Sequence, residues 1–159
     1  MTEKEALQVE AALIDVYPGL TNQMRGHDVE RGPAHVQQLI DICSAPVITE
    51  GLDEPILMLN ITHSITSTNS VYEATRGHWV LAPEKAGRVK YILGLANNIC
   101  RGVFEASEWQ PSSQEEGRYV FVGHKAGGEA QQKYKNKRIP DDWVPARGAA
   151  NPVRYQNCP

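Results

Sequence analysis

The feature that most constrains the fold is a pair of apolar runs, 89–96 and 99–106, that meet at Asn97-Asn98. Asparagine tolerates positive φ, which a tight two-residue hairpin turn needs at both of its central positions. Larger and smaller side chains alternate along the second run, as they do in a strand with two different faces. The sequence therefore predicts an antiparallel hairpin. Gly94 and Gly102 lie inside it and predict a bulge or a close approach of another backbone.

Further elements are expected on both sides of this hairpin. Thr2 and Glu5 form a capping box for a first helix, and Pro33 is suited to begin a second. Residues 55–62 are almost continuously apolar, which fits a strand buried on both faces. Shorter patterns predict a helix from Ser70 to Gly77, a turn or single helical turn at 83–88, strands at 78–81, 118–122 and 152–155, a polar loop at 110–117 and a polar helix at 127–137.

Together these elements predict an α+β fold. N-terminal helices would pack on a mostly antiparallel sheet, or on a small and partly open barrel that is PUA-like by analogy. Residues 1–62 form the expected helical region and residues 63–159 the strand-rich binding region, within one compact unit.

Composition excludes several classes of protein. Hydrophobic residues make up 41% and charged residues 22% of the 159 residues, which is typical of a globular chain. No apolar run reaches the roughly 20 residues that span a bilayer, and no signal peptide is visible, so we expect no membrane partner and a cytoplasmic location. The three cysteines are far apart and show no metal-binding spacing.

Charge is distributed unevenly along the chain. Residues 1–74 carry three bases and eleven acids, whereas residues 75–159 carry thirteen bases and eight acids. A locally basic surface attracts phosphates even on an acidic protein, because exposed charges act mainly within a Debye length of about 8 Å. The alternative is that the two halves simply attract each other. Both interpretations stay open at this point.

Sequence motifs for catalysis are absent. The five histidines show no HExxH spacing, and the chain has no GxSxG, Walker or dinucleotide-binding motif. His63-Ser-Ile-Thr66 has the outline of a two-histidine phosphoesterase motif, but the second copy that such enzymes need is missing. We therefore predict no catalytic residues and no cofactor.

The second half interleaves bases with aromatic and amide side chains. Bases neutralise phosphates, and aromatic rings stack on nucleobases for about 1–3 kcal/mol each. Taken singly, the aromatic residues are more often core residues, and the basic run 133–138 is more often a solvated face. The combination predicts a nucleic-acid or nucleotide-binding surface made of Arg76, His78, Trp79, Arg101, Arg118, His124, Lys125, Arg147, Asn151, Arg154 and Tyr155.

Two stretches resemble a known family. Residues 10–22, EAALIDVYPGLTN, and then Arg25-Gly-His27 resemble the last part of a LEM-3-like GIY-YIG nuclease domain. That resemblance implies that Glu10 would hold a divalent metal from a helix. The pattern from Arg76-Gly-His-Trp79 to Asn151-Pro-Val-Arg-Tyr155 is similar to the strand-rich domain that follows this nuclease in bacterial and phage proteins.

The sequence departs from the pattern of this nuclease family, and the departure argues against nuclease activity. The GIY strand, the YIG strand and a helical arginine should precede the glutamate, but only nine residues precede Glu10. One carboxylate cannot both fix a metal and activate a nucleophile. The leading hypothesis is therefore a non-catalytic binding module for nucleic acid or a phosphorylated small molecule, with a homo-oligomer as one option. The alternatives are a phage-type sponge for a nucleotide signal, a metal-dependent nuclease and a protein-interaction domain.

Overall fold

A computed structural model describes residues 44–68, 70–145 and 151–158. The chain divides into two compact units, Met1–Ser44 and Ala45–Pro159, and the second unit contains nearly all of the described residues. The helices expected at 2–16 and 33–43 lie outside the described residues. The strand expected at 55–62 belongs to the second unit.

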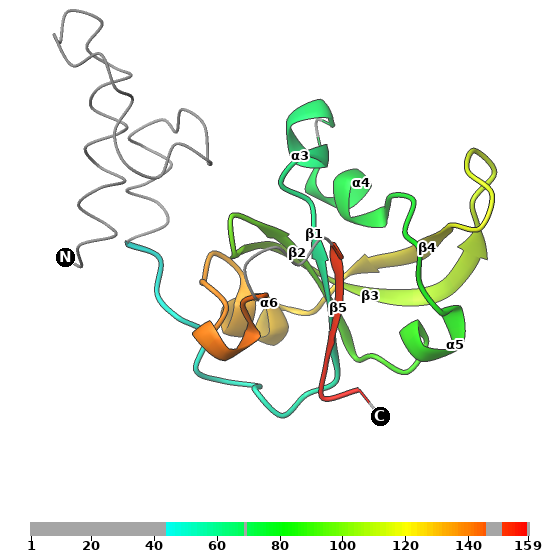
Figure 1. Cartoon of the computed structure of the whole chain (residues 1–159). Helices are drawn as coiled ribbons and strands as arrows, with labels where there is room; N and C mark the ends of the chain where they lie inside the picture. Colours follow the sequence, from blue (N-terminus) through cyan, green and yellow to red (C-terminus); the bar gives the residue numbers. More distant parts are fainter. Residues whose placement is uncertain (1–43, 69, 146–150, 159) are drawn as a thin grey trace, which may run out of the picture. The chain divides into compact units, whose positions relative to one another are not determined.

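The second unit is built on one open five-stranded sheet with the order β4-β3-β2-β1-β5 (Figure 1). The β1 and β2 strands are parallel, and every other neighbouring pair is antiparallel. The α+β prediction is confirmed, whereas the barrel alternative is wrong because β4 and β5 form opposite edges of the sheet. The strands are β1 (Ile56–Asn60), β2 (Tyr91–Ala96), β3 (Ile99–Pro111), β4 (Tyr119–Lys125) and β5 (Val153–Gln156).

Short helices occupy the connections within this unit. In the described residues none is long and apolar enough to cross a bilayer. They are α3 (Ser64–Ser67), α4 (Val71–Arg76), α5 (Pro83–Ala86), α6 (Gly128–Tyr134) and the 3-10 turn η2 (Asp141–Trp143).

The predicted hairpin is confirmed as β2 and β3. Asn97 and Asn98 have φ values of 53° and 62°, so both central turn residues are left-handed. Gly94 pairs with Gly102 and Leu95 with Cys100, which leaves Arg101 as the extra residue of a β-bulge. The close approach at Gly94 is made by a side chain and not by another backbone, because a Cβ on Gly94 would lie well within the van der Waals contact distance of Thr75 Oγ1.

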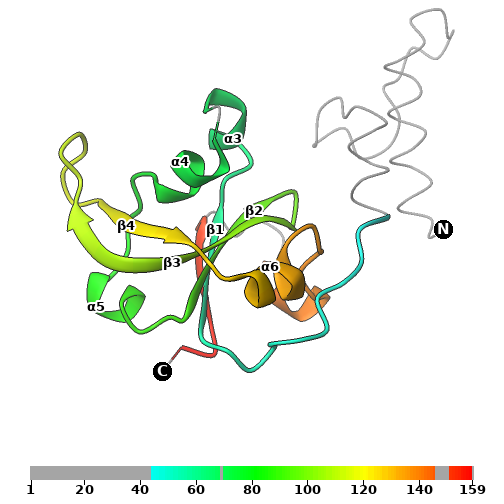
Figure 2. The same cartoon turned by 180° about the vertical axis from the view of Figure 1, so that it is seen from behind.

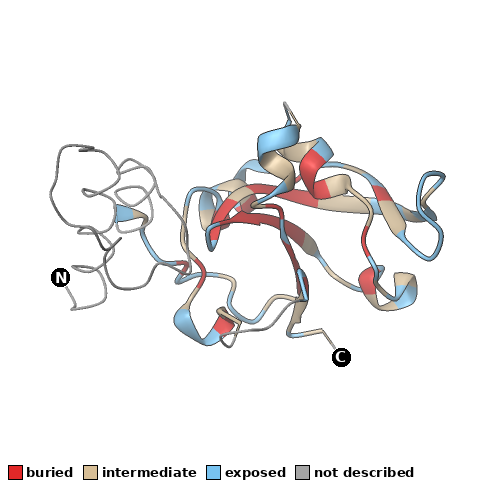
Figure 3. Cartoon of the chain, turned by 45° about the horizontal axis from the view of Figure 1, so that its top comes forward, coloured by how far each residue is buried: buried red, intermediate tan, exposed pale blue. Residues whose placement is uncertain are grey.

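Both faces of the sheet are covered, as the apolar pattern of residues 55–62 predicts. Ile56 and Met58 of β1 pack in a core with α6 and η2, whereas Leu57 and Leu59 pack in a second core with α4 and α5. Figure 2 shows α6 beside the end of β4, and Figure 3 shows buried residues concentrated along the sheet. β5 pairs with β1 at the edge, as predicted for 152–155.

Three predicted boundaries are wrong. Residues 78–81 form no strand, because only Trp79 makes a bridge, to Tyr119. β3 continues past Ala106 into the first two residues of the expected loop and ends at Pro111, and β4 continues past Val122 to Lys125. A second register shift between Ala106 and Glu108 keeps the apolar residues of the longer hairpin on the inner face. That shift is not visible as a sequence pattern.

Candidate functional site

The structure brings together His78 and Arg118 at the far end of the β3–β4 hairpin. His78 Nδ1 lies 2.7 Å from Ser112 Oγ. That oxygen already accepts the backbone N–H groups of Gln114 and Glu115, at 3.0 and 2.9 Å. These contacts tie the side chain of His78 to the loop between β3 and β4.

The arginines at this end have acidic partners. Arg118 Nε lies 2.7 Å from Glu115, and Arg118 Nη1 donates to the carbonyl of His78 at 3.0 Å. Arg76 lies 3.6 Å from Glu73, one helical turn earlier in α4. Because each charge is compensated by its neighbour, these arginines present little net positive potential to a ligand.

Trp79 is not part of an exposed surface. Its side chain is only 8% exposed, and Nε1 donates to the carbonyl of Thr75 at 2.8 Å. An indole whose ring is packed and whose N–H is bonded cannot stack on a base without local unfolding. Trp79 is therefore a core residue, which corrects its assignment to the binding surface.

The predicted binding residues on β5 and just before it do not lie with the other predicted binding residues. Arg154 pairs with Met58 and donates to the carbonyl of Trp143, whereas Tyr155 pairs with Leu57 on the opposite face. Tyr155 is largely packed, Lys85 lies over its ring at 5.0 Å, and burial raises its pKa. Asn151 accepts the N–H of Val153 at 2.9 Å, a local turn contact. Arg147 and Glu10 lie outside the described residues.

Four bases lie on segments that border the N-terminal part of β3 or on that part itself. The N–H of Asn136 bonds to the carbonyl of Cys100 at 2.7 Å, and the N–H of Cys100 bonds to the carbonyl of Lys137 at 2.9 Å. These bonds bring the segment after α6 alongside the bulge. The end of β4 lies on the same stretch, since its last residue pairs with Phe104. We call Arg101, Lys125, Lys135 and Lys137 the β3 basic cluster.

Charge balance sets the β3 basic cluster apart from the paired bases of the unit. Within the described residues its four members make no ion pair, and neither do Lys85, Arg88 and Arg154, whereas Arg76, Lys90, Arg118, Lys133 and Arg138 all do. Lys125 and Lys135 are exposed, and Arg101 and Lys137 are half-buried. His124, the next predicted residue, is exposed and lies 3.8 Å from Glu105. Most of the length of β3, roughly 30 Å at ~3.3 Å per residue, separates this cluster from the hairpin end.

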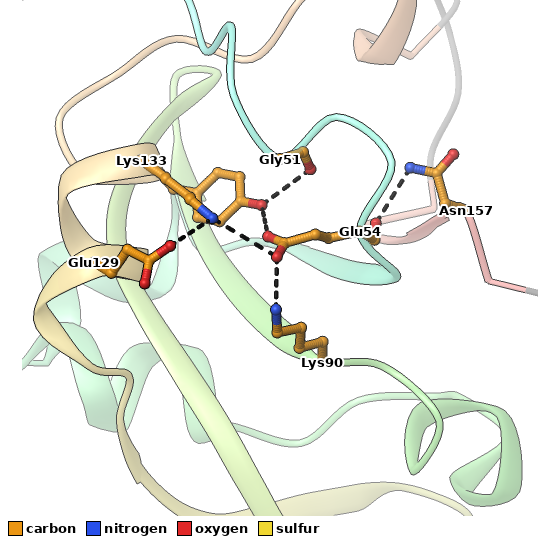
Figure 4. Close-up of polar contacts among 7 residues, drawn as sticks. Gly51, Glu54, Lys90, Glu129, Lys133 and Asn157 are labelled. Carbon is orange, nitrogen blue, oxygen red and sulfur yellow. Dashed lines mark hydrogen bonds and ion pairs between the residues drawn. The ribbon is translucent and has the colours of Figure 1, made fainter.

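A second polar group is centred on Glu54, which precedes β1 (Figure 4). Its side chain is 14% exposed and lies 2.6 Å from Lys90 Nζ and 3.8 Å from Lys133 Nζ. The Tyr134 hydroxyl donates to the same carboxylate and lies 3.0 Å from the carbonyl of Gly51. Asn157 donates to the backbone carbonyl of Glu54 at 3.2 Å. Four separate segments meet here, so we call this group the Glu54 junction.

In the Glu54 junction, each shifted pKa moves further from pH 7. Burial opposes ionisation of Glu54, but hydrogen bonds from Lys90 and Tyr134 outweigh it and hold its pKa below the usual value. The hydrogen bond to Glu54 raises the pKa of Lys90, and the bond to Glu129 raises that of Lys133. Burial, and then Glu54, raises the pKa of Tyr134. A general acid or base needs a pKa near the working pH, so this junction is suited to holding segments together.

Sequence reasoning identified Arg101 and Lys125 as candidate binding residues, but it did not find either group as a whole. It noted the run 133–138 only as a solvated face and did not single out Glu54. The contacts that build the two groups join residues far apart in the chain, and no local pattern encodes them.

Neither metal-binding side chains in the described residues nor comparisons with known proteins indicate a further site. Nowhere in the described residues do three or more histidine, cysteine or acidic side chains gather in a way that could hold a metal. The chain matches no protein-family model, and comparisons with curated proteins and with solved structures found no match. The resemblance to the GIY-YIG nucleases stays a prediction.

Proposed function

We propose that the strand-rich unit is a non-catalytic binding module for nucleic acid, which holds phosphates through the β3 basic cluster. The observation that carries the proposal is the charge balance of that cluster. Its four bases have no acidic partner in the described residues, whereas both arginines at the hairpin end are paired. An unpaired base keeps its full attraction for a phosphate and loses no existing ion pair when it binds.

The placement of the bases supports a polymer over a free nucleotide. Arg101, Lys125 and the two lysines that flank Asn136 come from three separate segments, and each of them borders residues 100–104 of β3. Four cations spread over a surface can contact successive phosphates of one strand. A single nucleotide carries its phosphates in one chain at one end and would use only some of these cations.

The acid–base chemistry available near the cluster also fits a binding role. Cys100, the nearest thiol, is buried, and burial raises its pKa to about 12, so it is not a thiolate nucleophile at neutral pH. The Glu54, Lys133 and Tyr134 side chains of the Glu54 junction have pKa values shifted away from the range of a general acid or base.

Fluorescence anisotropy with the full chain and a labelled 20-base-pair duplex at low salt tests the proposal. We expect measurable binding, and we expect the double variant Lys135→Gln/Lys137→Gln to weaken it by roughly tenfold. Arg88→Gln is the matched control for the loss of one charge. Arg88 is exposed and makes no ion pair in the described residues. It lies just before β2, at the end of the β2–β3 hairpin that is away from the Asn97-Asn98 turn.

Three results would contradict this assignment. The first is no binding to duplex, single-stranded DNA or RNA at low salt. The second is an equal loss of affinity in Arg88→Gln and in a single Lys135→Gln variant. The third is tight stoichiometric capture of a free nucleotide with little salt dependence, which would favour the sponge alternative.

A further inference from the structure

We infer that the β3 basic cluster recognises the phosphate backbone of a duplex and makes no stacking contact with bases. This inference rests on the proposed function and specifies how the ligand is held. Its basis is the combination of unpaired bases with the burial of the nearby phenylalanine and tyrosine rings.

Most of the large aromatic residues pack in the two cores. Of the ten phenylalanine, tyrosine and tryptophan side chains in the described residues, five are buried and the other five, Tyr72, Tyr91, Trp109, Tyr119 and Tyr155, are half-buried. The rings closest to the cluster along the chain are Phe104 and Tyr134, which are 5% and 0% exposed. Phe104 packs edge-on against Tyr72, with ring centroids 5.4 Å apart. A base approaching the cluster therefore meets lysine and arginine side chains and finds neither of these ring faces free.

Stacking is what makes single strands good ligands for proteins without sequence preference. A surface that does not stack must obtain its affinity mainly from charge. A duplex carries one charge per roughly 1.7 Å of its axis and releases about 0.9 counterion per neutralised phosphate, against about 0.7 for a single strand. The same four bases therefore gain more from a duplex than from a flexible single strand.

Exposed amides beside the cluster fit backbone contact as well. Asn97, Asn98 and Asn136 are exposed and have positive φ. The backbone of Asn98 accepts the N–H of Ile139 at 2.9 Å, which holds the hairpin turn next to the segment after α6. Neutral amide donors can bond to phosphate oxygens, as they commonly do in protein–DNA complexes.

Acidic side chains limit the surface on two sides. Glu129 lies 3.0 Å from Lys133 on α6, and Glu105 lies 3.8 Å from His124 on the neighbouring strand. Neither pairs with a member of the cluster. Because Glu105 follows Phe104 directly and its side chain is 40% exposed, its charge repels a phosphate bound at the cluster.

The experiment compares full-chain binding to three probes of equal length at several salt concentrations. The probes are two 20-base-pair duplexes of unrelated sequence and the single strand dT20. We expect the two duplexes to bind equally and both to bind several-fold more tightly than dT20. If all four bases neutralise a phosphate, the logarithm of the association constant falls with the logarithm of salt concentration at a slope of about −3.6 for duplex.

Variants separate this inference from the proposed function. Lys135→Gln should reduce the magnitude of the duplex slope by about 1 and affect both duplexes alike. Glu105→Gln should tighten duplex binding by about twofold, since it removes a like charge from the ligand's surroundings. Tighter binding to dT20 than to either duplex, or a strong preference between the duplexes, would overturn the inference while leaving nucleic-acid binding in place. Absence of binding to all three probes and to RNA would overturn both.

Discussion

At the scale of single residues, Gly94 is a position of the sheet that leaves no room for a side chain. A Cβ there would lie 3.2 Å from Ile61 Cδ1 and closer still to Thr75 Oγ1. Thr75 cannot easily move, because it is fully buried and donates to the carbonyl of Val71 at 2.6 Å. We expect Gly94→Ala to lower the free energy of unfolding by about 1–3 kcal/mol, measured by urea denaturation.

A control and a rescue test the stated cause. Gly128→Ala adds the same methyl group at the start of α6 with nothing within 4 Å, so it should leave stability unchanged or slightly higher. Thr75→Ala removes the obstructing atoms, so the double variant should be destabilised by less than the sum of the two single changes. Simple additivity would show that the contact with Thr75 is not the source of strain.

Residue-scale predictions succeeded where the backbone itself is special. Gly94, Asn97 and Asn98 have properties that depend on φ or on the absence of a side chain, and both are visible in the sequence. Trp79 is different, because whether an indole is buried or exposed depends on what folds over it. Here its ring joins the core beneath α4 and α5, a position that no neighbouring residue indicates.

At the scale of elements, the β2–β3 hairpin depends on its two left-handed asparagines. Asn98 has φ of 62°, a conformation that costs a β-branched residue roughly 1–2 kcal/mol. Asn98→Val should therefore destabilise the unit by about that amount, whereas Asn98→Gly should be neutral or stabilising. Thermal unfolding followed by circular dichroism would measure both. Equal destabilisation by valine and glycine would mean that the asparagine side chain, and not the turn geometry, matters.

Elements were predictable where a local pattern defines them. The β1 strand was found from its continuous apolar run and the short helix α4 from its flanking Ser70 and Gly77. The length of β3 was not, because its second half is polar and exposed and is held as a strand by pairing with β4. The parallel pairing of β1 with β2 follows from the crossover that contains α3, α4 and α5, and apolar patterns do not determine strand order.

At the scale of the whole unit, the predicted binding residues separate into three places. His78 and Arg118 lie at the hairpin end, Arg101 and Lys125 border residues 100–104 of β3, and Arg154 faces η2. Sequence could identify which residue types bind phosphate but could not group them, since grouping depends on strand order and on the return of the segment after α6. The proposed site accordingly keeps two of the predicted bases and adds Lys135 and Lys137.

The Glu54 junction also acts at this scale, because it ties the segment before β1 to the start of β2, to α6 and to the C-terminal residues. The pKa of Glu54 is lower in the folded unit than its reference value of 4.5. The unfolded chain therefore takes up a proton first as the pH falls. The stabilisation by ionised Glu54 is complete above that reference value and is lost as the pH falls through the folded pKa.

We therefore expect the stability difference between the wild type and Glu54→Gln to be greatest near pH 7 and to shrink as the pH falls below about 4.5. Urea denaturation of both proteins between pH 3 and pH 7 measures it. Glu129→Gln is the control, because that carboxylate also pairs with Lys133 but is 85% exposed, so its removal should change stability little at any pH. A constant difference between wild type and Glu54→Gln across this range would mean that packing, and not the carboxylate charge, accounts for the role of Glu54. A difference that shrinks in acid would place the charge of one carboxylate among the forces that hold these four segments together.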